Sequence, residues 1–276
     1  MQLFRTKKSI LGVLLILVIG TACEKNFDVS PELNWRSIKV SQNQSQKQDP
    51  FKSVCAVVAA DLAGAVTGGK WGSLLGPWGG AAGAILLGGV SSYGAHELVN
   101  SSATSGKSWP NSNSHDSYDV QFYSHESVNP FDHEMIVHNE LLVEAVNSMQ
   151  NYNTFLSKSN VYNVMEAALL SSDINISSGY PSFAEVEQHM DQNGRILHST
   201  VTSLFEDPAD DVWVAYDLYR SNLLIAANYD DFITYSLAFE NSISTDQTLL
   251  DDDRDLILRL CSLARSSAAY WINQDL

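Results

Sequence analysis

The chain has 276 residues, of which 45% are hydrophobic and 17% are charged, and its formal net charge is −16. This length allows one or two domains, and this apolar fraction is ordinary for a globular protein, which argues against disorder of the whole chain. A surface this acidic repels phosphate backbones and anionic lipid headgroups. Composition therefore excludes nucleic acid as the expected partner and leaves a lipid chain or an apolar surface as the route to a membrane.

The first 22 residues have the pattern of an export signal. Arg5, Lys7 and Lys8 form a positively charged start, and their removal makes the remaining chain three charges more negative. Ile10–Ile19 is apolar but too short to cross a bilayer of about 30 Å as a helix. The order of these segments predicts a signal peptide over residues 1–22.

Small residues directly precede the first cysteine. Gly20, Thr21 and Ala22 stand before Cys23. This tract resembles a bacterial lipobox, in which the cysteine thiol receives diacylglycerol and becomes the new N-terminus. The resemblance implies lipidation of Cys23 and a lipid anchor in a membrane. A plain secretory signal followed by an incidental cysteine is the alternative.

Residues 23–50 are polar and rich in glutamine, asparagine and serine. Such a composition buries too little apolar surface to offset the entropy lost on ordering. We therefore expect a flexible tether that holds the rest of the chain away from the anchor.

Composition changes abruptly over residues 51–99, which contain few charges. Pro77 lies in a Gly-Pro-Trp-Gly-Gly sequence, a strong turn signal. We predict two helical arms, Val54–Leu75 and Gly80–Leu98, folded back as an antiparallel hairpin.

Small residues recur every fourth position through this hairpin, and on a helix such positions share one stripe. Glycine costs about 1 kcal/mol relative to alanine inside a helix, so the pattern is tolerable only where close backbone packing returns the loss. These residues are the predicted sites of helix packing or membrane contact: Gly64, Gly68, Gly72, Gly76, Gly80, Ala84 and Gly88.

Three interpretations of the hairpin compete. A plain flexible linker would lack the regular spacing. A buried hairpin, packed under the acidic domain, and a hairpin that meets a bilayer or further copies of itself both fit the stripe. Asp61 and Lys70 would each cost about 3 kcal/mol near the centre of an inserted helix, so insertion would be conditional or oligomeric. Folding back at Pro77 also predicts an ion pair between Asp61 and His96 at the open end.

Residues 100–130 are rich in serine and asparagine and indicate a second linker. Residues 131–276 show helical periodicity throughout and predict an acidic α-helical domain of about five helices without a substantial sheet. His138 lies on one apolar face, where we expect a core histidine bonded to a neighbour. Ser182 with Glu185 matches a capping box, and Asp207 before a proline predicts another helix start. Apolar positions continue this pattern in the last helix: Leu256, Ile257, Leu260, Cys261 and Ala264.

Motifs for chemistry are weak. His133 and His138 are five residues apart, which places them on different helix faces and argues against a zincin site. The acidic run Asp251–Asp255 lacks the glycine and glutamate of a calcium loop, and a helix N-terminus explains it. Cys55 and Cys261 are either bridged or buried free thiols. We expect no cofactor and no metal.

Four short segments carry a resemblance to a family. They are Ala60–Ala65 with the glycine ladder after it, Gly88–Tyr93, His138–Leu142 and Ser262–Trp271. Together they are similar to glycine-zipper lipoproteins of Bacteroidota. The resemblance implies a location and an architecture rather than an activity. The zipper alone also resembles double-glycine-type bacteriocins, which are short, cationic and free, whereas this chain is long, acidic and tethered.

We therefore expect a mainly α fold, with a glycine-zipper hairpin followed by an acidic helical bundle. The expected function is that of a non-enzymatic lipoprotein, anchored to the outer membrane or surface of a Gram-negative cell envelope. The hairpin would contact the membrane or pair copies of the chain. A bacteriocin-like pore former or antagonism factor is the second hypothesis, and an enzyme of unrecognised type is the third.

Overall fold

The computed structural model describes residues 34–40, 49–73, 77–102, 129–150, 157–171, 182–207 and 209–272. Over these ranges the chain forms nine α-helices and one 3-10 helix, and its only extended pairing is a single bridge between Met190 and Ile196. The mainly α fold is thus confirmed. The elements are η1 (Trp35–Ser37), α2 (Asp49–Ser73), α3 (Pro77–Ser102), α5 (Asp132–Gln150), α6 (Lys158–Ser171), α7 (Phe183–Glu187), α8 (His198–Ser203), α9 (Asp211–Ile225), α10 (Tyr229–Thr245) and α11 (Asp251–Ile272).

The predicted hairpin is confirmed, with slightly longer arms than expected. Helices α2 and α3 pack along each other in antiparallel directions. Helix α3 begins at Pro77 itself, because proline has no amide hydrogen and its fixed φ suits a first helical turn. The same helix continues to Ser102, into the segment expected to be a linker.

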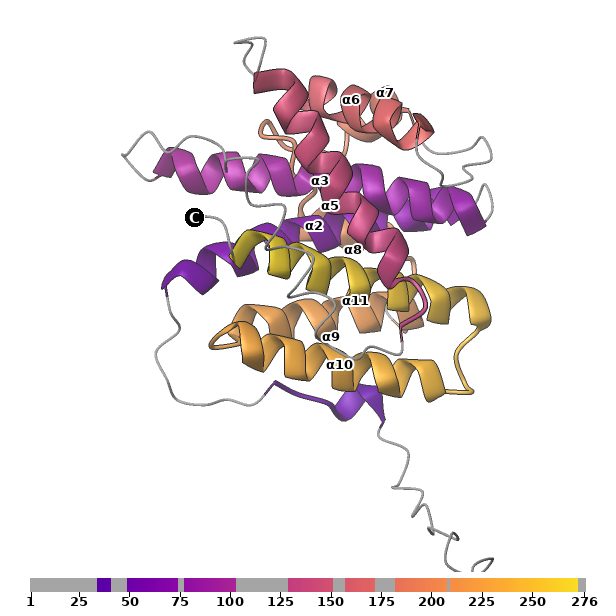
Figure 1. The fold of residues 1–276 in the computed structure, drawn as a ribbon. Coiled ribbons are helices and arrows are strands. Elements are labelled where there is room, and N and C mark those ends of the chain that lie inside the picture. The colour runs from indigo at the N-terminus through magenta and orange to yellow at the C-terminus, as the bar shows by residue number, and fades with distance from the viewer. Residues whose placement is uncertain are drawn as a thin grey trace, which may run out of the picture. The chain divides into compact units, whose positions relative to one another are not determined.

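Helices α2 and α11 lie side by side in the middle of the bundle (Figure 1). Helices α9 and α10 pack on one side of them, and α3 and α5 pack on the other. Helix α6 packs against α3 and α5 at the end of the bundle opposite α10, and α7 packs against α6 (Figure 1). The hairpin and the C-terminal helices, which the sequence suggested as successive domains, belong to one compact unit, Asn34–Leu276.

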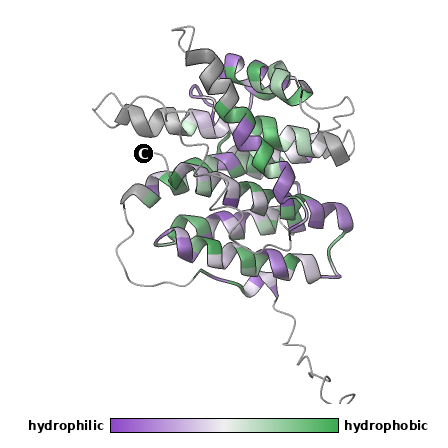
Figure 2. Ribbon diagram, in the orientation of Figure 1, coloured by the Kyte–Doolittle hydropathy of each residue, from purple (hydrophilic) through white to green (hydrophobic). Residues whose placement is uncertain are grey.

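The pattern of apolar residues explains why the hairpin is central. Helix α2 has few charged residues and is buried along most of its length, which requires other helices around it. The C-terminal helices α9, α10 and α11 carry both hydrophilic and hydrophobic residues (Figure 2). Their apolar faces point inward, and the predicted apolar positions of α11 are all buried.

Three helix starts were predicted in the C-terminal part of the chain, and two of them are confirmed. The backbone N–H of Ser182 donates to the Glu185 carboxylate (2.7 Å), as in a capping box. Helix α9 instead begins three residues later than expected, because the Asp210 carboxylate, not Asp207, accepts from the first free backbone N–H groups. The acidic run from Asp251 does open a helix, as expected.

Part of the expected tether is packed. Trp35 has no exposed surface, and Ile38 and Val40 are also buried in the core. The prediction of a flexible tether over 23–50 is therefore wrong for residues 34–40. The prediction relied on the average composition of the segment, which is polar despite these three apolar side chains. Helix α2 begins at Asp49, and Cys23 and the predicted signal peptide lie outside the described residues.

Candidate functional site

The glycines bring the backbones of α2 and α3 into direct contact. A Cβ atom on Gly64 would stand 2.1 Å from the carbonyl oxygen of Leu87, and one on Gly68 would stand 1.9 Å from that of Gly83. No side chain fits at these separations. The contact therefore depends on the absence of a Cβ and is stabilised by dispersion and Cα–H···O interactions.

The remaining stripe residues have different surroundings. Gly72, Gly80 and Ala84 are buried, whereas Gly76 lies outside the described residues. A Cβ on Gly88 would stand 2.9 Å from Asp61 Oδ1. The absence of a side chain at Gly88 thus makes room for a buried charged group.

That group is an ion pair between α2 and α5. Asp61 Oδ1 lies 3.1 Å from His138 Nε2, and both side chains have no exposed surface. On the other side of the ring, His138 Nδ1 lies 3.0 Å from the carbonyl oxygen of Ile85. A carbonyl only accepts hydrogen bonds, so we assign a proton to Nδ1, which leaves Nε2 to face the carboxylate.

Electrostatics favour the charged form of His138. Burial alone lowers the pKa of its imidazole, but the charge of Asp61 and the hydrogen bonds to Asp61 and Ile85 outweigh burial and raise that pKa above 6.5. The imidazolium and the carboxylate then form a buried ion pair. The pair joins α2 to α5, and the Ile85 carbonyl adds α3 to the same cluster.

The predicted partner of Asp61 was His96, whereas the residue that the structure places beside Asp61 is His138. The facing positions Gly64–Leu87 and Gly68–Gly83 set a register that places Asp61 level with Val90. That level is about 9 Å along the helix from residue 96. The side chain of His96 lies outside the described residues. His138 was instead expected to be a core histidine with a bonded neighbour, and this expectation is confirmed.

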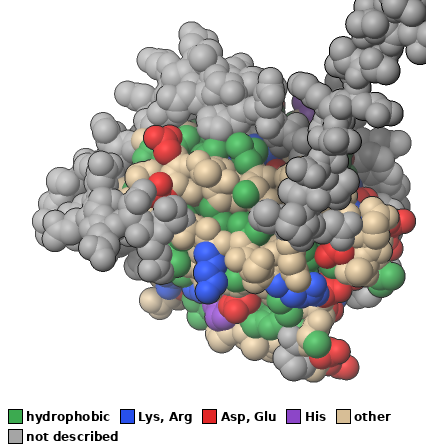
Figure 3. Space-filling view, turned by 90° about the horizontal axis from the view of Figure 1, so that it is seen from below, with side chains coloured by type: hydrophobic (Ala, Val, Ile, Leu, Met, Phe, Trp, Pro, Cys, Tyr) green, Lys and Arg blue, Asp and Glu red, His purple; other side chains and the backbone are tan. Residues whose placement is uncertain are grey.

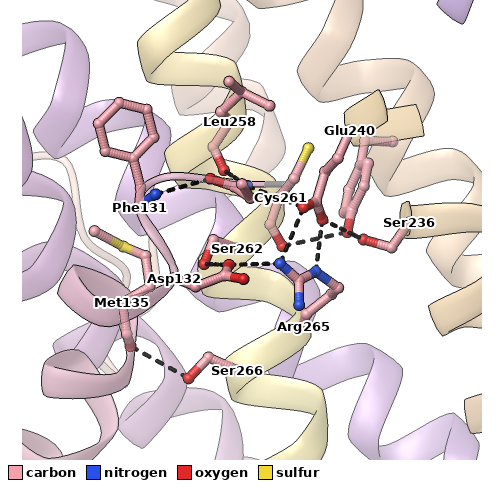
Figure 4. Close-up of polar contacts among 12 residues, drawn as sticks. Phe131, Asp132, Met135, Ser236, Glu240, Leu258, Cys261, Ser262, Arg265 and Ser266 are labelled. Carbon is pink, nitrogen blue, oxygen red and sulfur yellow. Dashed lines mark hydrogen bonds and ion pairs between the residues drawn. The ribbon is translucent and has the colours of Figure 1, made fainter. Parts of the chain in front are cut away.

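A second buried cluster joins α10, α11 and α5 (Figure 4). Arg265 Nε lies 2.6 Å from Glu240 Oε1, and Arg265 Nη2 lies 2.9 Å from Glu240 Oε2, so the contact is bidentate. Arg265 also contacts Asp132 Oδ1 at 2.5 Å. The Arg265 and Glu240 side chains are 2% and 1% exposed, so this pair is almost completely desolvated.

Neutral groups complete the hydrogen bonding of Glu240. Ser236 Oγ donates to Glu240 Oε1 (2.9 Å), and Asn129 Nδ2 donates to Oε2 (3.0 Å). The Asn129 amide also donates to the carbonyl of Leu258 (2.8 Å). Asn129 therefore binds the end of the predicted 100–130 linker to the core.

The residues of this second cluster have a structural role rather than a reactive one. Burial, with the nearby charge of Glu240, raises the pKa of the Cys261 thiol well above its usual value. A protonated, inaccessible thiol is a poor nucleophile. Cys55 donates to the carbonyl of Leu223 (3.3 Å). Both cysteines are free and buried, which settles that alternative against the disulfide.

No group of three or more potential ligand side chains could hold a metal ion within the part of the chain that the structure describes. Of the sequence-predicted site residues, the structure brings together Asp61 and Gly88, beside the contact made by Gly64 and Gly68.

Sequence reasoning missed Glu240 and Arg265 as a pair. A signal existed, because Arg265 falls four residues after Cys261 on the apolar face of α11. Glu240 likewise follows Ser236 by one helical turn on the buried face of α10. Opposite charges on two facing apolar stripes indicate a buried ion pair.

The chain matches no protein-family model, no curated protein and no solved structure. The resemblance to glycine-zipper lipoproteins thus rests on the short motifs quoted above and stays a prediction.

Proposed function

We propose that this protein is an exported lipoprotein, held at the outer membrane or surface of a Gram-negative cell envelope by lipid on Cys23. Its helical domain is a preformed, non-catalytic unit with an acidic, solvent-facing interaction surface. The hairpin serves as the internal support of this domain. The membrane attachment is supported by the charged start, the apolar stretch and the small residues before Cys23.

The backbone contact of Gly64 and Gly68 with α3 carries the proposed role of the hairpin. The stripe that was a candidate for membrane or self-association contact is covered by the second arm of the same chain. Association of two copies through it would therefore require the hairpin to open. A non-catalytic role is supported by the internal pairing of the buried charges, Asp61 with His138 and Glu240 with Arg265.

The proposal is tested by mass analysis and fractionation of the protein expressed in a Gram-negative host. The mature N-terminus should be an acylated Cys23, and the protein should sediment with membranes. Cys23→Ser should move it to the soluble fraction without a change in helical content. An unmodified Cys23, or a soluble wild-type protein, would contradict the lipid anchor.

A second candidate function is a hairpin that enters a bilayer, as in a pore former. One observation favours it: Phe51–Gly72 is long and apolar enough to cross a membrane, although 83% of its most apolar window is buried in the protein, as in the core helix of a soluble protein. Insertion would have to break the Asp61–His138 pair and the ion pair of Lys70 with Asp210 (3.0 Å). Dye release from vesicles separates the candidates. We expect no release by the acylated protein, and release that depends on intact glycines would favour the pore former.

A further inference from the structure

The segment Asn34–Val40, here called the N-terminal clasp, is fastened to α9 and α10. The buried Trp35 ring meets Phe239 edge to face, with ring centroids 5.8 Å apart. Its Nε1–H donates to the carboxylate of Asp246 (2.8 Å). The aromatic contact and the hydrogen bond together fix one end of the clasp at the C-terminal part of α10.

The other contacts of the clasp are made with α9. Arg36 forms an ion pair with Asp211 at the start of that helix. The backbone N–H of Val40 donates to Asn222 Oδ1 (2.9 Å), and the Asn222 amide donates in turn to the carbonyl of Leu218 (2.9 Å). Asn222 is buried, so loss of this bond would leave its oxygen unsatisfied inside the core.

The clasp shortens the connection between the proposed lipid anchor and the folded domain. From Cys23 to Asn34 there are 11 residues, which reach at most about 40 Å when extended. A flexible chain of this length has a root-mean-square span of about 18 Å. Without the clasp the first packed element would be α2, and the connection would reach about 90 Å.

We propose that the clasp turns the α9–α10 side of the domain toward the membrane surface and leaves the α6–α7 end facing away from it. This inference rests on the proposed lipidation of Cys23. In Figure 1 the clasp lies against α10 at the bottom of the bundle, and α6 and α7 lie at the top. The domain is then oriented by its attachment point, without any part of the bundle entering the bilayer.

The character of the lower face fits a surface that lies near lipid but does not enter it. Figure 3 shows this face directly, with hydrophobic, basic and acidic side chains interspersed over the described residues. Within the clasp, the side chain of Arg36 is 43% exposed. Charged groups of both signs favour water over the bilayer interior, so the face would remain hydrated at the membrane surface.

Energy transfer from two reporter positions to acceptor lipids in vesicles tests this orientation. Gln247→Cys places an exposed thiol beside the clasp, and Ala167→Cys places an exposed thiol on α6. The native Cys55 and Cys261 are buried and do not compete for the dye. A compact unit of this size is about 45 Å across. We therefore expect transfer from position 247 of the acylated protein to exceed that from position 167 at least about twofold.

Two variants isolate the clasp. A Gly/Ser insertion of about twelve residues after Lys25 lengthens the connection without touching the fold and should reduce the difference between the reporters. Trp35→Ala should reduce it further while helical content is kept. Equal transfer from both positions of the acylated wild-type protein would overturn the orientation and leave the lipoprotein proposal standing. A chain that is not acylated would overturn both.

Discussion

Replacing Gly68 with alanine tests whether the hairpin is held by backbone contact. The new Cβ would stand 1.9 Å from the Gly83 carbonyl oxygen and 2.3 Å from its carbon, whereas real Cβ contacts essentially never fall below 3.0 Å. Because both neighbours are backbone atoms, the two helices would have to move apart by roughly 1 Å. Overpacking of this kind costs about 1–3 kcal/mol, and a backbone clash belongs at the upper end of that range.

Helix propensity acts in the opposite direction. Alanine stabilises a helix interior by about 1 kcal/mol relative to glycine, so Gly68→Ala should lower the free energy of unfolding by about 2 kcal/mol net. Gly69→Ala is the matched control. Its Cβ would stand too close only to the terminal Cδ1 of Leu256, at 2.6 Å, while the Gly80 carbonyl oxygen would lie at an ordinary 3.8 Å. That side chain can rotate at a cost of about 1 kcal/mol, which leaves a net change near zero.

Urea denaturation followed by far-UV circular dichroism measures both variants. The mature chain is used with Cys23→Ser, so that it carries no lipid. A loss of 2 kcal/mol moves the unfolding midpoint down by about 0.7 M if the m-value is about 3 kcal/mol/M. If Gly68→Ala were as stable as the wild type, or were stabilised alongside Gly69→Ala, the two backbones could not be in contact as described.

Three further predictions concern the buried polar groups. Although burial lowers the pKa of His138, the charge of Asp61 and the hydrogen bonds to Asp61 and Ile85 together outweigh burial and raise that pKa above 6.5. The stabilisation by the pair is therefore complete below about pH 6.5 and is lost as the pH rises through the folded-state pKa. Asp61→Asn should abolish this alkaline loss in urea titrations at several pH values, and an unchanged pH dependence would argue against an ion pair. Arg265→Met should destabilise the protein by about 3–5 kcal/mol because Glu240 stays buried without its partner, whereas adding Glu240→Leu should recover much of that loss; a double variant as unstable as the single one would show that packing, not charge, is responsible. Because burial covers both native thiols and raises the pKa of Cys261, a thiol reagent such as Ellman's should react with neither cysteine in the folded protein and with both in urea, and rapid labelling of the native state would contradict their burial.

The hairpin could be predicted because its signal is local. Glycine at every fourth position places small residues on one stripe of a helix, and this stripe needs another backbone packed against it. The proline-containing turn signal predicts that the next helical arm folds back and supplies that backbone. The exact partner residues were less accessible. Gly83, which meets Gly68, lies one residue before the register position Ala84, because α2 and α3 are separate helices whose relative rotation the spacing does not set.

The partner of Asp61 could not be found by the same local argument. Within an isolated hairpin, only residues of the second arm can pair with Asp61, and this restriction led to the prediction of His96. The actual partner, His138, lies on α5 and reaches Asp61 through the packing of α5 across the hairpin. Long-range contacts of this kind depend on helix crossing geometry, which periodicity in a single chain does not specify.

The packed Trp35 shows the limit of composition as a guide. The average composition of a segment rich in glutamine, asparagine and serine stays polar even when the segment contains one large aromatic residue. That ring nevertheless buries enough apolar surface to hold a short segment in place. Trp35 followed by Ile38 and Val40 was the available signal.

The neighbours of α2 have a consequence for how the protein is made. Helix α2 is among the first segments to emerge during synthesis, yet α11, which lies alongside it, is the last helix to appear. Until then its apolar sides have no cover, and exposed surface of that kind favours aggregation. The nascent chain must therefore be kept from aggregating until α11 has been made, and a premature stop before α11 should yield an insoluble product.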